Sequence, residues 1–392
     1  MNRSVLISGA GIAGPSLAYW LGRHGDRVTV VEQAPGPRAS GSAVDFRGDQ
    51  LALLTRMGVL EKIREAQTGM GDQVIVNAAG RRRSAYPAAV FSGEVEIDRA
   101  DLARILHDHS APHAEYVFGD RVTAMTQHAD GVDVTFARGA ARRYDIVVGA
   151  DGLHSAVRGL TFGAGHTHYL GYHAASFEVA NTFGLDHSGV IHNAPNRYVG
   201  VASARDAGRA IVSLMFATPE PAYRRDDLDG QKSLLARHFA DVGWRTPELL
   251  AALRDVTELY FAPLSQVRLD RWSSGRVVLL GDAAWCAGPG GNGTGHAMLG
   301  AYTLAGELAR AGHETAFARY EEVMRPPVTK SQKFAAGAGK HLAPPTEKAI
   351  RRRDRTFRVL SSRPMTGLLT WLSTRTADTG ELTDYPLPAV TG

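Results

Sequence analysis

Apolar and polar positions near the N-terminus follow a strand–helix–strand pattern. Residues 4–8 form a short continuous apolar run, which is typical of a strand buried inside a parallel sheet. Residues 16–23 place their large apolar side chains at helical spacing, and Gly25 follows them as a helix-ending residue. Residues 27–31 are a second apolar run, and Glu32 comes directly after it. The pattern predicts a βαβ unit at the start of an α/β chain.

A glycine motif, Gly-Ala-Gly-Ile-Ala-Gly, joins the first predicted strand to the predicted helix. In such motifs the first glycine (Gly9) permits a tight turn, the second (Gly11) lets the backbone approach a pyrophosphate, and the third (Gly14) allows close helix–strand packing. Glu32 lies 18 residues after Gly14, at about the spacing of an acidic side chain that binds ribose hydroxyls. The motif predicts a dinucleotide with its pyrophosphate at the helix N-terminus, but it does not by itself distinguish FAD from NAD.

Two later motifs share one form, an apolar strand that runs into a glycine-containing turn. The first is Asp-Ile-Val-Val-Gly-Ala-Asp-Gly at residues 145–152, and the second is Gly-Arg-Val-Val-Leu-Leu-Gly-Asp-Ala-Ala at residues 275–284. A glycine-rich stretch at residues 289–295 follows the second motif, and residues 296–311 are predicted to form a helix. The chain therefore carries three ordered strand–turn motifs.

Together these motifs resemble those of the class A flavoprotein monooxygenases, the p-hydroxybenzoate-hydroxylase-like group. Within that group the chain is most similar to tetracycline-inactivating and natural-product hydroxylase members. Further matching stretches are residues 41–48, 96–102, 158 and 300–302, so the resemblance covers about residues 1–330. It implies FAD as cofactor and an α/β fold, with a Rossmann-like FAD-binding domain, an inserted α+β substrate domain built on an antiparallel sheet, and a C-terminal helix.

The resemblance also implies roles for individual charged residues. Asp282 would hold the ribityl chain of FAD, Arg99 would lie by the ribityl and phosphate region, and Asp45 would face the flavin. For Arg99, and for Arg158 after the second motif, a structural ion pair is the alternative. The predicted helix that begins near residue 296 would stabilise negative charge on reduced flavin through its N-terminus.

Further positions in the resemblance concern the nicotinamide cofactor and the flavin ring. Arg38 corresponds to a position linked to the nicotinamide cofactor, and Asp151 to one that serves both FAD and NADPH. Backbone beside the isoalloxazine ring would come from Pro289, Gly291 and Gly293, since glycines suit a close approach to a planar ring.

Three features of this sequence depart from the family pattern. Trp285 stands where the family often has histidine, and Gly300 stands where many members carry aspartate. The glycine loop of the family commonly reads Gly-Gln-Gly followed by an asparagine, and here residues 291–295 read Gly-Asn-Gly-Thr-Gly. These departures bear on the substrate rather than on FAD binding.

Between residues 166 and 264 the pattern changes from alternating strands and helices to successive strands. Predicted strands are residues 168–180, 189–204, 209–217 and 258–269, and predicted helices are residues 231–242 and 248–254. Such strands beside a doubly wound unit indicate an α+β domain. We expect a FAD-binding domain of residues 1–70, 98–165 and 265–330, a substrate domain of residues 71–97 and 166–264, and a C-terminal helical segment of residues 331–392.

In the family that the chain resembles, substrate lies between the antiparallel sheet and the flavin. The candidates to line this pocket are His192, Tyr198, Met215, Phe216, Phe261 and Trp285. Ordinary core packing is the alternative for each of them. No side chain is assigned as a catalytic base, and the 15 histidines show no spacing typical of a metal site.

The C-terminal region is predicted to be helical at residues 346–360 and again at residues 365–372. The FAD-binding domain is expected to end after Arg325, Pro326 and Pro327. The resemblance suggests that a C-terminal helix bridges the domains or gates the pocket, and structural bracing is the alternative. The last dozen residues are expected to be loose.

Composition narrows the class of protein further. A chain of 392 residues is longer than one compact core usually accommodates. Its composition of 44% hydrophobic and 21% charged residues is ordinary for a globular protein. The net charge of +4 is spread along the chain apart from arginines at residues 81–83 and 351–353, so nucleic acid is not expected as a partner. A single cysteine, Cys286, fits a reducing cytoplasm, and no apolar run reaches membrane-spanning length.

The resemblance predicts a single-component monooxygenase, a monomer or dimer, that hydroxylates an aromatic or polycyclic small molecule. NADPH or NADH would reduce FAD transiently, because no second glycine-rich βαβ motif occurs, and dioxygen would then form a flavin C4a-hydroperoxide. Baeyer–Villiger oxygenation remains an alternative, as does a non-redox flavoprotein that binds or cyclises a small molecule. Halogenation is not expected, because the chain has no Trp-x-Trp-x-x-Pro segment.

Overall fold

A computed structural model describes residues 2–37, 43–86, 88, 93–219, 223–224, 226–290, 292–360 and 382–387. Two predicted site residues, Arg38 and Gly291, lie outside the described residues. The predicted helical piece at residues 365–372 also lies outside them.

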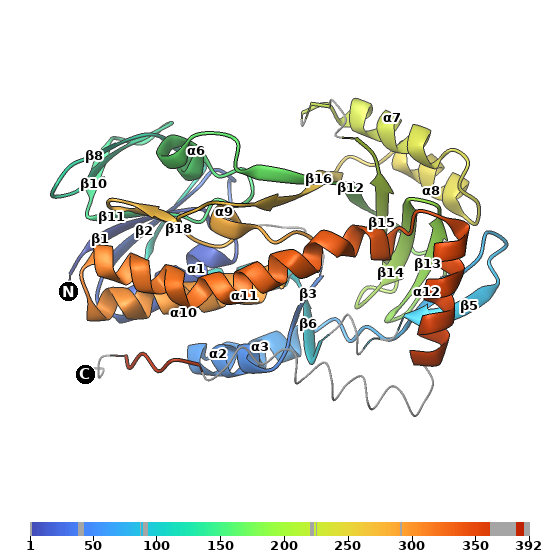
Figure 1. Ribbon diagram of the computed structural model, residues 1–392, viewed down its shortest axis with the longest axis horizontal. Coiled ribbons are helices and arrows are strands. Elements are labelled where there is room, and N and C mark those ends of the chain that lie inside the picture. The colour runs from blue at the N-terminus through green and yellow to red at the C-terminus, as the bar shows by residue number, and fades with distance from the viewer. Residues whose placement is uncertain are drawn as a thin grey trace.

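A six-stranded sheet carries the three strand–turn motifs (Figure 1). Its spatial order is β17 (Ser273–Ser274), β18 (Val277–Leu279), β11 (Ile146–Gly149), β1 (Ser4–Ser8), β2 (Arg27–Glu32) and β7 (Glu115–Phe118). All neighbours run parallel except β17 and β18. β11 and β18 are buried along their whole length, which is why these segments are continuous apolar runs.

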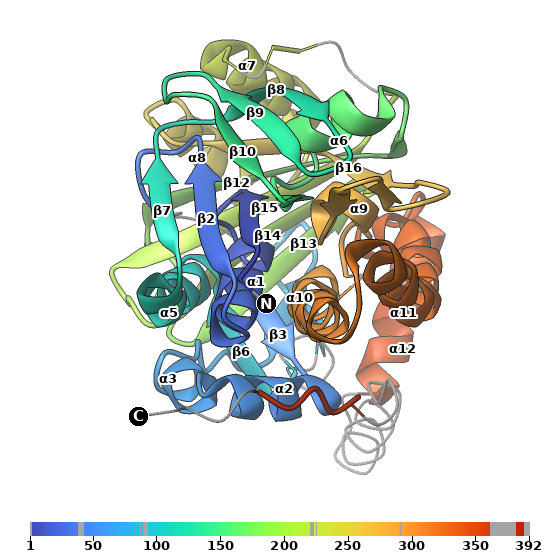
Figure 2. The same cartoon turned by 90° about the vertical axis from the view of Figure 1, so that its left-hand side faces the viewer.

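Helices cover one face of this sheet, and a small antiparallel sheet lies on the other side (Figure 2). The helices are α1 (Ala13–Arg23), α5 (Arg99–Ser110), which leads into the short η1 (Ala111–His113), α10 (Gly293–Arg310) and α11 (His313–Leu342). The small sheet consists of β8 (Val122–Gln127), β9 (Val132–Phe136) and β10 (Arg142–Tyr144), and α6 (Ala156–Phe162) lies beside it.

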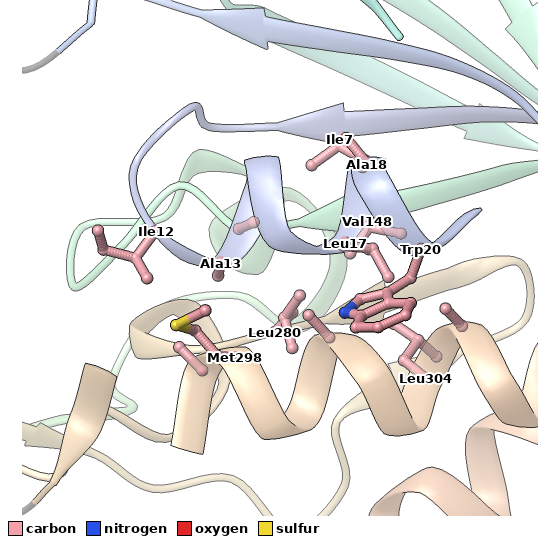
Figure 3. Close-up of a cluster of buried hydrophobic side chains, with 14 of the residues drawn as sticks. Ile7, Ile12, Ala13, Leu17, Ala18, Trp20, Val148, Leu280, Met298 and Leu304 are labelled. Carbon is pink, nitrogen blue, oxygen red and sulfur yellow. The ribbon is translucent and has the colours of Figure 1, made fainter. Parts of the chain in front are cut away.

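The core of this half lies between the sheet and the pair α1 and α10. Figure 3 shows Trp20 of α1 pointing toward α10, where Leu304 lies close to its indole. Trp20 and Leu304 are 1% and 0% exposed. Burial of such large apolar side chains stabilises the fold by about 1.5–3 kcal/mol each.

A second, seven-stranded sheet contains the strands predicted in the middle of the chain. Its order is β16 (Tyr260–Val267), β12 (Thr167–Ala180), β15 (Arg209–Ala217), β14 (Arg197–Ser203), β13 (Ser188–Ala194), β4 (Gln73–Val76) and β5 (Arg82–Tyr86). All neighbours are antiparallel except β13 and β4. α7 (Leu228–Phe239) and α8 (Thr246–Leu253) pack on one face, and α12 (Glu347–Leu360) contacts β5 and β13.

Shorter elements connect the two halves. β3 (Ala43–Phe46) and β6 (Val95–Asp98) form a two-stranded antiparallel pair, followed in sequence by α2 (Asp49–Met57) and α5 respectively. α3 (Leu60–Glu65) follows α2, and the four-residue α9 (Asp282–Trp285) follows β18. α11 extends along the molecule from the six-stranded sheet to the seven-stranded sheet (Figure 1).

α11 continues through two successive prolines. Pro326 and Pro327 lie inside a helix that continues from residue 313 to residue 342. Met324 and Val328 on either side are 0% and 2% exposed. Their tertiary packing keeps the helix continuous, although a proline inside a helix costs about 3 kcal/mol of stability.

Part of the C-terminus is docked, so the expectation of a loose last dozen residues is wrong for residues 382–387. Tyr385 is 3% exposed, and its hydroxyl donates a hydrogen bond of 2.7 Å to Glu307 on α10. Its backbone N–H donates to the Tyr302 hydroxyl over 3.0 Å. The ring fits because Gly306 has no side chain, since a Cβ there would lie 2.1 Å from Tyr385 Cγ.

We predict that Gly306→Ala displaces this docked segment and destabilises the protein by about 1–3 kcal/mol, the cost of overpacking a core site. Gly159→Ala is the matched control, because Gly159 is also helical and a Cβ there meets nothing within 4 Å. Differential scanning calorimetry checks the prediction. Equal melting temperatures for the two variants would show that Tyr385 is not held in this way.

Candidate cofactor site

The three strand–turn motifs meet at one edge of the six-stranded sheet. β18, β11 and β1 are parallel neighbours, with Ser8 opposite Gly149 and Gly149 opposite Leu279. Their turns are in contact, because a Cβ on Gly9 would lie 2.5 Å from the Ala150 carbonyl oxygen. The edge formed by the carboxyl ends of parallel strands is where open α/β sheets bind ligands.

The first glycine turn leaves room for a phosphate. Gly9 has a φ of +110°, and a Cβ on Gly14 would lie 1.9 Å from the Gly9 carbonyl oxygen. A Cβ on Gly11, in contrast, would meet nothing within 4 Å. α1 begins without a side-chain cap and without an acidic residue in its first turn. Its N-terminal amides are therefore available to an anion such as a pyrophosphate.

Glu32 at the end of β2 is fixed against this turn. One carboxylate oxygen accepts a hydrogen bond of 2.8 Å from the Ala10 N–H, and the other accepts one of 2.9 Å from the Ala34 N–H. Each carboxylate oxygen has further lone pairs, which would suit the two hydroxyls of a ribose. Glu32 is therefore held beside the first glycine turn.

Asp282 and Arg99 come together from distant parts of the chain. Their side chains are 4.0 Å apart at the closest N and O atoms, and they are 32% and 34% exposed. Asp282 begins α9, Arg99 begins α5, and a Cβ on Gly293 at the start of α10 would lie 3.6 Å from Asp282 Oδ1. A carboxylate, a guanidinium and a helix N-terminus therefore converge, with both side chains still accessible to a ligand.

Asp151 has a different local setting, because its carboxylate caps α6. It accepts hydrogen bonds from the Ser155 hydroxyl, from the Ala156 N–H over 2.8 Å and from the Val157 N–H over 3.2 Å. Burial raises its pKa. These bonds fix the turn between β11 and α6.

Arg158 ties the same turn to α9. Its guanidinium donates to the Ala283 carbonyl over 3.0 Å and to the Leu153 carbonyl over 2.6 Å. Burial lowers its pKa. The partners are backbone carbonyls rather than a carboxylate, so Arg158 connects the second and third motifs structurally.

Asp45 lies on β3, which packs against α10. Its carboxylate forms a salt bridge of 2.7 Å with Arg47. The Asp45 side chain is 37% exposed, so one carboxylate oxygen remains accessible to a ligand.

Pro289 precedes Gly290 in the glycine loop between α9 and α10.

Two glutamines that the sequence analysis did not identify anchor this loop. Gln332 on α11 donates to the Val267 carbonyl over 2.7 Å and to the Trp285 carbonyl over 3.1 Å. Gln266 on β16 is 0% exposed and donates to the Ala287 carbonyl over 2.8 Å and to the Gln332 carbonyl over 2.7 Å. Glutamine has no motif of its own, and only the tertiary structure reveals the pair.

Trp285 lies in the core rather than beside an open pocket. It is 1% exposed, and its ring centroid is 4.5 Å from that of Trp272. A Cβ on Gly300 would lie 3.0 Å from Trp285 Cη2 and 3.0 Å from Leu280 Cδ1. The indole therefore occupies the volume that a side chain at residue 300 would need, and the two departures from the family pattern compensate each other.

The other pocket candidates divide between the two faces of the seven-stranded sheet. Tyr198 and Met215 are paired across β14 and β15, and they lie on the face where Tyr172 and Ala343 pack. Burial raises the pKa of Tyr198 to about 12. Gly339 of α11 packs on the Tyr172 ring, because a Cβ there would be 2.5 Å from it. The face of the sheet that carries Tyr198 and Met215 therefore lies against α11.

Three candidates point the other way, into the core beneath α7 and α8. Phe216 stacks on His238 of α7 at 4.2 Å between ring centroids, and Phe261 packs against the same cluster. His192 lies 6.2 Å from the Trp244 ring on this side, and its Nδ1 is 3.2 Å from the Val76 carbonyl oxygen. Side chains of a strand alternate between faces, so the neighbours Met215 and Phe216 cannot line one pocket.

Within the described part of the chain, no group of three or more histidine, cysteine, aspartate or glutamate residues could hold a metal ion. None of the helices described there is long and apolar enough to cross a membrane.

A family model described as "FAD binding domain" matches residues 2–330. The chain belongs to this FAD-binding family. The flavoprotein is 42% identical to an uncharacterized protein of Mycobacterium tuberculosis over 329 residues, which covers 81% of this chain and 88% of that protein. It is 34% identical to a flavin-dependent monooxygenase of Legionella longbeachae over 342 residues, covering 85% and 88%.

Among solved structures, the flavoprotein is similar to the crystal structure of tetracycline destructase Tet(55). The TM-score is 0.85 at 32% identity, and the match covers 98% of this chain and 99% of that one. These findings confirm the predicted fold class, the FAD cofactor and the monooxygenase class of the flavoprotein.

The open space at Gly11 gives a direct test of the pyrophosphate position. We predict that Gly11→Leu leaves the melting temperature of the apoprotein unchanged but lowers FAD affinity at least about tenfold, or by about 1.4 kcal/mol. Gly36→Leu is the control, because a Cβ on Gly36 also meets nothing within 4 Å. Absorbance at the flavin band after gel filtration measures retention, and equal retention by both variants would contradict the assignment.

The packing of Trp285 on Gly300 predicts strong coupling between the two positions. Gly300→Asp should destabilise the flavoprotein by about 2–4 kcal/mol through overpacking and an unpaired buried carboxylate. Trp285→His should leave a cavity. The double variant should be more stable than the sum of the single effects by about 1–3 kcal/mol in a double-mutant cycle. Additive effects on the free energy of unfolding would show that the two sites are independent.

Proposed function

We propose that this flavoprotein hydroxylates an aromatic or polycyclic small molecule, with NADPH or NADH as reductant and dioxygen as the source of oxygen. The observation that carries the proposal is the convergence of three motifs around an open glycine turn, in a chain of the FAD-binding family. One crystal structure similar to this chain is that of a tetracycline destructase, which supports a polycyclic substrate.

Bound FAD would supply the redox and oxygen-transfer chemistry. The N-terminal amides of α1 would hold its pyrophosphate, and Glu32 would hold the ribose hydroxyls. Asp282 would accept hydrogen bonds from the ribityl hydroxyls, while Arg99 adds positive charge nearby. The N-terminus of α10 would stabilise negative charge on the reduced cofactor. In the balanced overall reaction, substrate, dioxygen, NAD(P)H and a proton would give hydroxylated substrate, NAD(P)⁺ and water.

The substrate would lie between the glycine loop and one face of the seven-stranded sheet. That face carries Tyr198 and Met215, and α11 runs along it. Apolar Met215 would contact a ring system, and the Tyr198 hydroxyl would orient a polar group. The roles first expected for His192, Phe216 and Phe261 are not retained, because these side chains pack beneath α7 and α8.

We also propose the division of the chain into FAD-binding segments 1–70, 98–165 and 265–330 and substrate segments 71–97 and 166–264. β4 and β5 join the strands β12 to β16 in one sheet, which supports assigning residues 71–86 to the substrate unit. α11 crosses the proposed boundary at residue 330, so the C-terminal segment begins inside a continuous helix.

The test measures oxidation of NADPH and NADH by the purified holoprotein in the presence of phenols and polyketides. We expect a substrate to accelerate nucleotide oxidation, and mass spectrometry with labelled dioxygen should show one oxygen atom incorporated from the gas. Asp282→Ala should lose most of this activity together with its flavin.

Three outcomes would contradict the proposal. Ring expansion or ester formation would identify a Baeyer–Villiger enzyme. Conversion of a substrate without nucleotide or dioxygen would identify a non-redox flavoprotein. No oxidation of either nucleotide with any substrate would exclude a nicotinamide-dependent oxygenase.

A further inference from the structure

Two arginine clusters that are far apart in the sequence lie side by side in the structure. Arg358 on α12 donates a hydrogen bond of 2.9 Å to the Arg83 carbonyl on β5. The Arg83 guanidinium is 3.5 Å from the buried carboxylate of Asp354 on α12. The arginines at residues 81–83 and those at residues 351–353 therefore occupy one region of the molecule.

α12 exposes its basic side chains and buries its apolar ones. Ile350 and Phe357 are 1% and 5% exposed. The exposed charged side chains of the helix are Glu347, Lys348, Arg351, Arg352, Arg355 and Arg358. Glu347, the acid among them, is paired with Arg351 at 4.0 Å. Within the described part of the chain, Lys348, Arg352 and Arg355 form no ion pair, so their charge is available to an anionic partner.

The second half of α11 extends this basic surface. Figures 1 and 2 both show α11 and α12 on the same side of the molecule, with α12 following the end of α11. Residues 326–346 contain no aspartate or glutamate, and Lys330, Lys333 and Lys340 are exposed there. We name the exposed lysines and arginines of residues 330–358 the cationic side.

The two most exposed large apolar side chains in the described part of the chain lie on the same two helices. Phe334 on α11 is 71% exposed, and Val359 at the end of α12 is 60% exposed. A single exposed apolar side chain is ordinary on a protein surface. Exposed apolar side chains interleaved with lysine and arginine on surface helices, however, are typical of helices that lie in the headgroup region of a membrane.

Two features favour a lipid surface over a nucleic acid as the anionic partner. Proteins that bind single-stranded nucleic acid stack its bases on aromatic side chains. The rings beside the arginines of α12 are instead packed on each other, with 4.6 Å between the ring centroids of Phe357 and Tyr86. An exposed aliphatic side chain such as Val359 gains free energy by entering a lipid layer but not by contact with a phosphate backbone.

We propose that the cationic side docks this flavoprotein on an anionic membrane surface. The lysines and arginines would pair with lipid phosphates, and Phe334 and Val359 would insert among the headgroups. The apolar faces of α11 and α12 stay packed against the protein, so the attachment is peripheral and reversible.

The docked orientation would bring the proposed substrate region close to the membrane. The sheet face that carries Tyr198 and Met215 lies against α11, and an apolar polycyclic compound concentrates in lipid. The enzyme would therefore take up its substrate beside the membrane in which that substrate accumulates. This consequence rests on the proposed function, whereas the docking itself does not.

The experiment is co-sedimentation of the FAD-loaded protein with vesicles. One set of vesicles consists of phosphatidylcholine alone, and the other of equal parts of phosphatidylcholine and phosphatidylglycerol. The protein should sediment with the anionic vesicles and stay in the supernatant with the neutral ones. A salt concentration of about 1 M should release most of the bound protein, because the Debye length then falls to about 3 Å.

Two variants separate the contributions of charge and apolar insertion. Arg352→Glu/Arg355→Glu should lower the partition coefficient for anionic vesicles at least about tenfold, because each basic side chain near an anionic leaflet strengthens binding about fivefold. Phe334→Ala should lower it severalfold and leave the dependence on salt in place. Since these side chains are exposed, the melting temperature and FAD content of both variants should match those of the parent.

Matched controls test whether position matters as well as net charge. Lys62→Glu/Arg237→Glu makes the same change in net charge on exposed residues of α3 and α7. Leu160→Ala shortens an apolar side chain of α6 that is 47% exposed. Both controls should bind anionic vesicles like the parent.

Several outcomes would overturn the inference. The parent protein could fail to sediment with anionic vesicles, or the α3 and α7 control could lose as much binding as the α12 variant. Binding to a short DNA duplex or single strand without binding to vesicles would assign the cationic side to nucleic acid instead. Turnover is not measured in this test, so failed docking leaves the proposed hydroxylation intact, and a protein without hydroxylase activity would still bind the vesicles.

Discussion

Parallel pairing of β18, β11, β1 and β2 is the constraint on which the cofactor site depends. Parallel strands end at the same edge, so three turns that are far apart in the sequence are brought within contact. One residue of a strand spans about 3.3 Å, so a slip of one residue would separate Gly9 from Ala150. The tight contact between Gly9 and Ala150 fixes the register of β1 and β11 sterically.

The sequence predicted the parts of the site that depend on local chemistry. The glycine turn and the acid at the end of β2 follow from short-range rules, whereas the aspartate after β18 was assigned through the family resemblance. The structure places all three at one edge. The sequence did not predict which face of the seven-stranded sheet each side chain would occupy. α7 and α8 cover one face of this sheet, and α11 and α12 pack on the other. Both faces are therefore apolar, and the alternation of apolar and polar residues along a strand does not indicate which face a side chain occupies.

Contacts between distant segments also had no signature in the sequence. Gln266 and Gln332 act by donating to backbone carbonyls, and any polar residue of suitable length could do so from many positions. Tyr385 can dock only because residue 306 is glycine and has no side chain. Nothing in the sequence distinguishes Gly306 from other helical glycines. The helix through Pro326 and Pro327 persists because tertiary burial outweighs a local preference.

Neighbouring side chains fill the space beside two glycines in the region where the sequence departs from the family pattern. Trp285 fills the volume beside Gly300, and Gln50 occupies the space beside Gly295, where a Cβ would lie 2.3 Å from its side-chain nitrogen. Neither exchange touches the open space at Gly11 or the pair formed by Asp282 and Arg99. The residues proposed to hold FAD can therefore stay in place while the structure around the glycine loop diverges. Because that loop lies between the cofactor site and α11, divergence behind it would alter the shape offered to a substrate without altering the redox chemistry.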